Sequence, residues 1–578
     1  MLQACGSEVS DNRHSEQGHF QRMTRMDQAT YLKYSVASID RAVDLVEGGA
    51  LEFNENLCMH LTRELSETNS CLLTGWPDVC ESRRVTLVQL YYVIKQAEIL
   101  VQKCCRSPDS LWPETAFILL AIKEDILDLI LHLRWWTSIL KIVSDSAQSK
   151  RNLEYYIKMV DEEIDSLKRI DREFETKLKD LTSSNNELEE AALKDKKLLL
   201  SKAEEFQKCY TTSELGTREH RAYLLSIHIH SVLRDEVPTK DFPKLPDEIA
   251  SKRELNEIKT MKANIGVGVS GGVSQVEWCG YDCALKMVHT YDKGFDNQRE
   301  TRIVKSLHHP HIVQSFGYWE AEIVDSEVDL YRDPAPPSED ESYVEAGSDL
   351  EETYLEDESD SKSYILMERM SSNLGDHIAA AKDGKTSLPF SNSVAIDIML
   401  QVAKAVWHMH SKNVVHNNLK TKNILVRSLP KDELPELSAE GFLQVKVGDF
   451  GLAKDKVMSS NQELFSEDSF DFSIMCVEVL SGRSPSGEDL EAIKKRAIRP
   501  RIPNTCPDYL KFCITSGLKS NVLDRPNFSD MWRMLRFAKL RSLGLIHENS
   551  KLRKQGLINE NSNLFSYQID DTIVARCI

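Results

Sequence analysis

The sequence predicts a multidomain chain, with an all-α N-terminal helical bundle and coiled-coil-like brace followed by an α+β domain of two lobes. Three observations support this fold class. Apolar residues recur at helical spacing over the first quarter of the chain, a seam of apolar residues with a seven-residue period follows, and a glycine-rich hairpin opens the second half. A length of 578 residues also exceeds one ordinary domain and predicts two or three.

The composition is that of an ordinary water-soluble protein, with 41% hydrophobic and 28% charged residues. A net charge of −19 argues against broad binding to nucleic acid, so no nucleic-acid partner is expected. The 13 cysteines lack the paired C-x-x-C spacing of a zinc ribbon. The first residues contain no apolar signal core, and Lys123, Glu124 and Asp125 interrupt the most apolar stretch, so we expect a cytoplasmic protein.

Residues 27–145 are expected to form a bundle of about four helices, after a disordered N-terminus at 1–26. Breaks near residues 48–49, 70–77 and 107–113 contain the glycine, proline and serine typical of connectors. The pair Trp135–Trp136 is interpreted as core packing at the end of the last helix. The helical spacing is clearest in Leu87, Leu90, Ile94, Ala97 and Val101.

Residues 146–210 carry the seven-residue seam and are expected to form the brace. Asp171 and Asn185 interrupt the seam, so self-association through a coiled coil and packing within one chain both remain open. The proline-containing segment 211–254 is predicted to be a linker. The seam consists of Leu153, Val160, Leu167, Phe174, Leu181 and Leu188, with Ile157, Ile164 and Leu178 between them.

A glycine-rich turn spans residues 265–273 between β-branched residues. Glycine lets backbone N–H groups approach phosphate oxygens, but the pattern alone also fits dinucleotide folds and simple turns. No helix pattern follows here. A second strand and a third strand ending in Lys286 follow instead, then a helical segment that contains Glu300. Residues 364–370 read as a further strand leading into a hinge.

Two later motifs bring oxygen ligands to the same region. Residues 415–426 contain His416-Asn417-Asn418, Lys420 and Asn423, and Asp449-Phe450-Gly451 follows a short strand pattern. The amide oxygen of Asn423 and the carboxylate of Asp449 are donors suited to a hard cation that also binds phosphates.

The order and spacing of these motifs resemble those of protein kinases and imply a bilobal protein-kinase-like fold at 255–540. In this interpretation residues 325–361, which are rich in Asp, Glu, Ser and Pro, form a disordered acidic insert, and 541–578 form a C-terminal tail. The resemblance implies ATP as cofactor, allows Mg²⁺ on Asn423 and Asp449, and pairs Lys286 with Glu300. The implied nucleotide-binding residues are Gly266, Gly268, Gly271, Val273, Ala284, Lys286, Glu300, Glu368, Met370 and Leu425.

The sequence departs from the kinase pattern at the catalytic base. Asn418 stands where a kinase has aspartate, and a neutral amide cannot accept the substrate proton. Asn417 replaces the arginine that meets a phosphorylated activation loop. Only residues 452–467 separate the Asp449-Phe450-Gly451 motif from the expected start of the long C-lobe helix, and they contain no A-P-E motif. Arg525 stands where a kinase has the arginine that pairs with the glutamate of that motif, so it lacks its usual partner. Glu463 and Glu467 are the candidate substitutes.

The domain order and the C-lobe run at 525–537 resemble plant mixed-lineage-kinase-domain-like proteins. That resemblance implies a pseudokinase, a kinase fold without phosphotransfer, controlling an N-terminal bundle in immunity or cell death. It implies an upstream receptor or kinase as partner and allows self-association. It also allows a peripheral membrane location on activation, although the sequence shows no strongly basic amphipathic face that would support membrane binding. Two alternatives stay open: a weakly active serine/threonine kinase in which Lys420 compensates for Asn418, and a non-catalytic scaffold.

Overall fold

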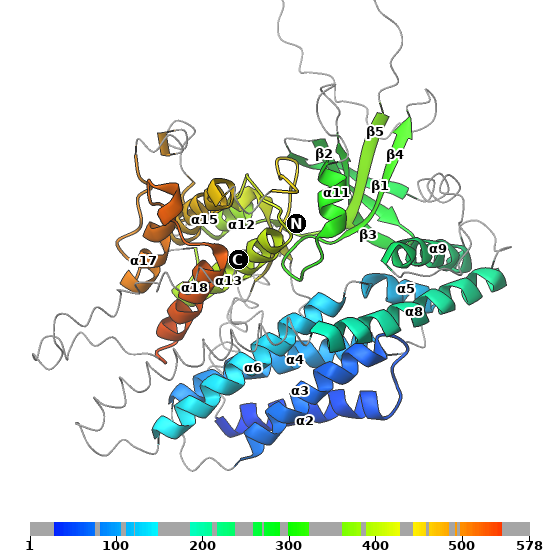
Figure 1. The fold of residues 1–578 in the computed structure, drawn as a ribbon, viewed down its shortest axis with the longest axis horizontal. Helices are drawn as coiled ribbons and strands as arrows, with labels where there is room; N and C mark the ends of the chain where they lie inside the picture. Colours follow the sequence, from blue (N-terminus) through cyan, green and yellow to red (C-terminus); the bar gives the residue numbers. More distant parts are fainter. Residues whose placement is uncertain are drawn as a thin grey trace, which may run out of the picture.

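The computed structural model has an N-terminal helical region and a two-lobed domain (Figure 1). The residues expected to form the disordered N-terminus, most of the brace seam and nearly all of the acidic insert and tail lie outside the described ranges. These ranges are 28–74, 81–105, 111–120, 122–147, 185–210, 217–236, 258–268, 271–288, 299–322, 361–382, 389–427, 443–457, 462–484, 492–493 and 498–545.

The helical region confirms the periodicity of the sequence. The five residues that marked the helical period between positions 87 and 101 are all at most 2% exposed, and the rings of Trp135 and Trp136 are buried with their centroids 4.4 Å apart. Helix α2 packs against α3 and α4, and α6 packs against both of these. The helices are α2 (Gln28–Glu47), α3 (Glu55–Leu73), α4 (Glu81–Lys103), α5 (Trp112–Ile118) and α6 (Ile122–Ala147).

The described end of the brace packs within the same chain. Helix α8 (Asn185–Tyr210) lies against α3, and its Asp195 carboxylate accepts hydrogen bonds from the backbone N–H groups of Asn56 (3.1 Å) and Leu57 (2.9 Å). A carboxylate at the start of α3 satisfies amides that have no partner inside the helix. Among the described residues, none of the helices is long and apolar enough to cross a membrane.

The segment expected to be a linker contains a helix. Helix α9 (Arg218–Glu236) packs against α5 and α8. The prolines that suggested a linker, at 238, 243 and 246, all lie beyond the end of this helix. They therefore mark only the later half of residues 211–254, and α9 extends the N-terminal helical region instead.

The first lobe of the second domain is an antiparallel sheet with one helix. The strand order is β1-β2-β3-β5-β4, so the first three strands form a meander, and the last two pair in reversed order. The elements are β1 (Ile258–Gly268), β2 (Gly271–Trp278), β3 (Tyr281–Val288), α11 (Arg299–Ser306), β4 (Ser315–Glu322) and β5 (Ser361–Glu368).

The second lobe is mainly helical and is centred on buried helix α13. Helix α15 begins at residue 462, six residues before the start expected from sequence, so the segment that follows the Asp449-Phe450-Gly451 motif is even shorter. The elements are β6 (Ser372–Asn373), α12 (Leu374–Lys382), α13 (Asn392–Ser411), η1 (Thr421–Asn423), β7 (Ile424–Arg427), β8 (Gln444–Val447), α15 (Gln462–Ser481), α17 (Asp508–Gly517), η2 (Val522–Asp524) and α18 (Phe528–Ser542).

The helical region contacts both lobes. Phe117 of α5 packs its ring against those of Trp278, Tyr281 and Phe316 in the sheet, with centroids 4.7–5.4 Å apart. At the second lobe, the Arg536 guanidinium of α18 stacks 4.5 Å over the ring of Trp135 in α6. Figure 1 shows α5 and α9 next to the sheet, α8 on their far side, and α6 passing below the helical lobe. The region is therefore placed to respond to both lobes.

Candidate nucleotide site

The glycine-rich hairpin is closed by β1 and β2, where Gly268 pairs with Gly271 and Gly266 pairs with Val273. A Cβ on Gly271 would lie 1.6 Å from the Met287 carbonyl oxygen, and its φ is +153°, so only glycine fits there. Gly271 therefore also has a structural role in the sheet. Residues 269–270, at the tip of the turn, lie outside the described residues.

Lys286 is at the centre of a buried cluster of charges at the interface of the two lobes. Its ammonium lies 2.6 Å from the Glu300 carboxylate of α11 and 2.9 Å from that of Asp449. The Lys286 and Glu300 side chains are only 4% and 7% exposed. In protein kinases the corresponding ion pair and the metal-binding aspartate must both be in place for phosphoryl transfer. The predicted pairing of Lys286 with Glu300 is present.

Electrostatics keep both ends of this cluster charged. Burial works to lower the pKa of Lys286, but the negative charges of Glu300 and Asp449 outweigh it and leave the pKa raised. Burial likewise works to raise the pKa of Asp449, and nearby Lys286 holds it below its ordinary value. The site therefore presents an ammonium and an ionised carboxylate to a metal–phosphate group.

The loop at 416–423 carries asparagine at position 418, where the sequence interpretation places the general base of a kinase. The Asn423 side-chain nitrogen donates a 2.8 Å hydrogen bond to the Asn418 carbonyl oxygen, which leaves the Asn423 amide oxygen as the atom available to a cation. Asn418 and Lys420 are both half-buried. The position that the sequence interpretation assigns to the general base therefore carries a neutral amide.

Asp468 organises this loop, a role that the sequence interpretation missed. Its fully buried carboxylate accepts backbone hydrogen bonds from His416 (2.9 Å) and Asn417 (2.8 Å) and contacts the His410 ring 2.9 Å away. Asn417 has a left-handed φ of +62°, which asparagine tolerates better than most residues. An aspartate placed directly before the apolar residues of α15 is the only sequence signal that could have indicated this role.

Helix α11 is tied to the chain that follows Asp449 by two arginines, which sequence reasoning also missed. Arg299 donates a 2.9 Å hydrogen bond to the Gly451 carbonyl, and Arg302 pairs with Asp455 at 2.6 Å. These contacts hold Glu300 toward Lys286 without the loop arginine that Asn417 replaces. Charged residues on a short helix are too common for their spacing to have predicted this.

Arg525 pairs with Glu467, one of the two residues proposed to replace the glutamate of the A-P-E motif. Its guanidinium, fully buried, lies 3.2 Å from the Glu467 carboxylate and donates to the Ser466 and Lys519 carbonyls. Glu463 is exposed in the first turn of α15. The buried cation is therefore compensated locally although the ordinary substrate-holding motif is absent.

The remaining predicted nucleotide contacts lie on the expected strands. Val273 pairs with Lys286 across β2 and β3, Ala284 pairs with Met367, and Leu425 lies in β7, while Met370 is buried just after β5. Whether these residues contact adenine stays a prediction.

Glu368 belongs to a different set of contacts. Its carboxylate accepts from Lys446 at 2.6 Å and pairs with Arg427. Burial opposes ionisation of Glu368, but these two cations hold its pKa below the ordinary value. A contact with adenine would therefore use the main chain of Glu368 and not its side chain.

The donor set fits Mg²⁺ held jointly with phosphates. Asn423 and Asp449 offer oxygen atoms, and Mg²⁺ usually takes one or two protein oxygens with phosphate and water completing its shell. Within the described ranges, no group of three or more His, Cys, Asp or Glu side chains is arranged to hold a metal by itself. These two residues would hold the ion at a bound nucleotide, where it would neutralise phosphate charge.

Comparison with known proteins agrees with this geometry. Residues 260–484 match the family model described as protein kinase domain. A light-sensor protein kinase from Ceratodon purpureus is 26% identical over 318 residues, covering 48% of this chain and 21% of that protein. A probable serine/threonine-protein kinase from Dictyostelium discoideum is 23% identical over 289 residues, covering 48% of this chain and 41% of that protein.

A third relative, an Aurora kinase from Saccharomyces cerevisiae, is 22% identical over 266 residues, covering 44% of this chain and 61% of that kinase. The chain thus spans between about a fifth and three fifths of the length of these three relatives. It contains a protein kinase domain, preceded by a helical region that lies outside the family match.

Proposed function

We propose that this chain is an ATP-binding signalling switch with a protein-kinase fold that has lost most or all phosphotransfer, a pseudokinase. The observation that carries the proposal is the combination of an assembled Lys286–Glu300–Asp449 cluster with an amide at position 418. The cluster supports binding of a nucleotide. The amide removes the group that would accept the substrate proton, and losing a general base costs about 10²–10⁴ in rate.

The helical region is proposed to be the part of the chain whose packing changes when the kinase-like domain binds nucleotide. It contacts the sheet through Phe117 and the helical lobe through Trp135, so a change in lobe closure on nucleotide binding would change both contacts. The resemblance to plant mixed-lineage-kinase-domain-like proteins suggests that the switch releases or assembles this region in plant immunity or cell death. An upstream receptor or kinase is the proposed source of the signal.

Thermal unfolding with ATP, with and without Mg²⁺, tests the nucleotide half of the proposal. Binding at 100 times the dissociation constant should stabilise the protein by about 2.7 kcal/mol. Lys286→Met should lose this stabilisation, whereas Lys259→Met, which removes an exposed lysine from β1 of the same sheet, should retain it. An unchanged melting temperature in wild type, or equal shifts in both variants, would contradict nucleotide binding at this site.

Weak kinase activity is the second candidate, favoured by the paired Lys286 and Glu300 and by Lys420 in the loop. Radiolabelled phosphate transfer should be measured on the preparation used for nucleotide binding, with Asp449→Ala as the control for contaminating kinases. The pseudokinase proposal expects no transfer above that control. Transfer by wild type that vanishes in Asp449→Ala would support the weak kinase instead.

The variant Asn418→Asp separates the two defects of the site. A gain of transfer would show that the missing base is the main obstacle. If nucleotide still binds and no transfer appears, the short segment before α15, which leaves little chain to hold a peptide substrate, is the deeper defect.

A further inference from the structure

Helix α11, which carries Glu300, is too short to hold its own position. It has only eight residues (Arg299–Ser306), and isolated helices shorter than about 12–15 residues are marginal in water. One face is buried through Glu300, Ile303 and Val304. The place of α11, and with it the pairing of Glu300 in the buried charge cluster, therefore depends on contacts with the rest of the domain.

The chain after residue 451 presents a carboxylate in a fixed place. Backbone hydrogen bonds join Lys454 to Val415 in both directions, each at 2.9 Å, and the Val457 N–H donates to the Asn413 carbonyl at 3.1 Å. Asp455 lies between these two anchored residues. Its backbone is thus tied to the second lobe, next to the loop at 416–423.

Arg302 of α11 binds this carboxylate through two N–H groups. Its Nε donates to one oxygen of Asp455 at 2.6 Å, and its Nη2 donates to the other at 3.4 Å. Exposed ion pairs usually contribute little because both side chains must be ordered. Here the Asp455 side chain is only 16% exposed and its backbone is already anchored. The hydrogen bond from Arg302 also holds the pKa of Asp455 below its ordinary value, so the carboxylate stays ionised.

A second contact ties α11 to the metal-binding motif itself. Arg299 donates a 2.9 Å hydrogen bond to the carbonyl of Gly451, two residues after Asp449. Lys286 is paired with Glu300 and Asp449 at once, at 2.6 and 2.9 Å. In protein kinases, phosphorylation of the activation loop controls this assembly. In this chain the assembly is present with an ordinary carboxylate in that segment.

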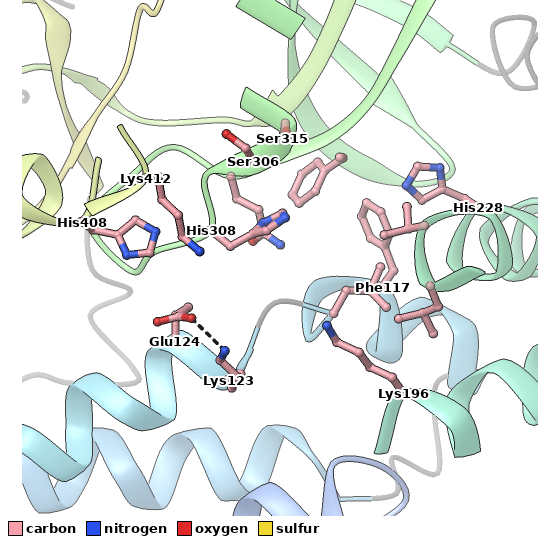
Figure 2. A pocket seen from close by; sticks show the side chains of 15 residues that line it. Phe117, Lys123, Glu124, Lys196, His228, Ser306, His308, Ser315, His408 and Lys412 are labelled. Atoms are coloured by element: carbon pink, nitrogen blue, oxygen red, sulfur yellow. Dashed lines mark ion pairs between the residues drawn. The ribbon is translucent and has the colours of Figure 1, made fainter. Parts of the chain in front are cut away.

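The far end of α11 faces the helical region. Ser306, its last residue, and His308 line a pocket together with Lys123 and Glu124 at the start of α6 (Figure 2). A shift of α11 would therefore change the surface against which the helical region lies. The position of this helix is common to the nucleotide site and to the contact with the helical region.

We propose that Asp455 is a built-in substitute for a phosphorylated residue. Paired with Arg302, it keeps α11 in place, so that the nucleotide site is assembled before any modification of the chain. Both are positioning residues, because they act through Glu300. The proposal rests on the nucleotide binding proposed for this chain and adds how that site is regulated. Loss of the ion pair, and not gain of a phosphate, lowers its affinity. The asparagine at position 417 agrees with this, because it stands where a kinase has the arginine that receives the phosphate.

Calorimetric titration of the full chain with ATP and Mg²⁺, before and after phosphatase treatment, tests the proposal. Wild type should bind ATP equally well in both preparations. Asp455→Asn should weaken binding by about threefold to fivefold, the effect of losing a partly exposed ion pair. Arg302→Asp should weaken it by about tenfold, since it sets two carboxylates against each other. Exchanging the partners, Arg302→Asp with Asp455→Arg, should restore affinity to within about twofold of wild type.

Lys454→Ala is the matched control, because Lys454 is exposed in the same segment and keeps its backbone bonds to Val415. It should bind ATP like wild type. Hydrogen exchange of residues 299–306 without nucleotide gives a readout that does not depend on ATP. These amides should exchange faster in Asp455→Asn than in wild type or Lys454→Ala.

The two measurements separate this proposal from nucleotide binding itself. If wild type does not bind ATP, nucleotide binding fails, and exchange in α11 that is equal in Asp455→Asn and wild type would overturn the role of Asp455 as well. Where wild type binds ATP, loss of binding after phosphatase treatment would overturn the proposal. So would an Asp455→Asn variant that equals wild type in both affinity and exchange.

Discussion

Asp128 of α6 and Lys404 of α13 form an ion pair between the helical region and the helical lobe, with side chains only 12% and 9% exposed. The His311 ring also approaches Asp128, at 4.0 Å. Helix α13 is largely buried at the core of its lobe, so this pair joins α6 to that core. Removing one partner would leave the other charge buried without compensation.

We expect Asp128→Ala and Lys404→Ala each to lower the free energy of unfolding by about 3–5 kcal/mol, because each leaves an unpaired buried charge. The double variant should lose clearly less than the sum of the two, since it removes both charges. Urea unfolding of all four proteins measures this cycle. Lys511→Ala, at an exposed position of α17, should change stability by less than about 0.5 kcal/mol, and strictly additive losses would show that the pair is not coupled.

Glu467→Ala should destabilise the protein by about 1–3 kcal/mol, because buried Arg525 loses this carboxylate partner while its hydrogen bonds to the Ser466 and Lys519 carbonyls remain. Glu463→Ala is the control on the same helix, with no expected effect beyond about 0.5 kcal/mol because Glu463 is exposed. Chemical unfolding compares the two. Equal effects would mean that Glu467 does not replace the missing motif.

Mg²⁺ should strengthen ATP binding through Asn423 and Asp449. We expect Asp449→Asn and Asn423→Ala to abolish most of the additional stabilisation that Mg²⁺ provides, since the first replaces a charged carboxylate with a neutral amide and the second removes an amide oxygen. Thermal shift with ATP and increasing Mg²⁺ measures this difference. Asp508→Asn, an exposed site on α17, controls for removal of a negative charge, and an unchanged Mg²⁺ response in Asp449→Asn would place the metal elsewhere.

His228 should make the protein less stable in acid. Burial lowers its pKa to about 4, opposed by a backbone hydrogen bond with Phe316, whereas the unfolded imidazole titrates near 6.5. The unfolded state therefore binds the proton first as pH falls below 6.5, and stability is lost down to about pH 4. From pH 7 to pH 5 this amounts to about 2 kcal/mol.

Unfolding of His228→Gln between pH 7 and pH 5 checks this. The variant should lose about 2 kcal/mol less than wild type over this range, while His220→Gln, a partly exposed histidine on α9, should follow wild type. Asp125 gives the opposite trend, because burial raises its pKa to about 6 and folding then favours its protonated form as pH falls. Asp125 is present in both variants, so its effect cancels in the comparison. Identical pH profiles would show that His228 is not buried as a neutral group.

Much of the kinase domain could be predicted because its evidence is local. The glycine-rich hairpin, the strand ending in Lys286 and the Asn423 and Asp449 motifs are short patterns whose residue types directly reflect their chemistry, and the structure brings Lys286, Glu300 and Asp449 together as expected. The helices up to α6 follow from the 3.6-residue period, since burying one face leaves a regular pattern in the sequence. That position 418 carries an asparagine is read directly from the sequence.

Tertiary structure alone decided how these parts meet. Whether Glu463 or Glu467 would reach Arg525, that Asp468 would hold the loop at 416–417, and that α9 would form beside α5 all depend on distant surfaces fitting together. The same holds for the ion pair between Asp128 and Lys404. Pairing across hundreds of residues leaves no period or spacing in the chain, because its energy comes from shape and charge that exist only after folding. Sequence determined the chemistry of each part, and packing determined which parts act on one another.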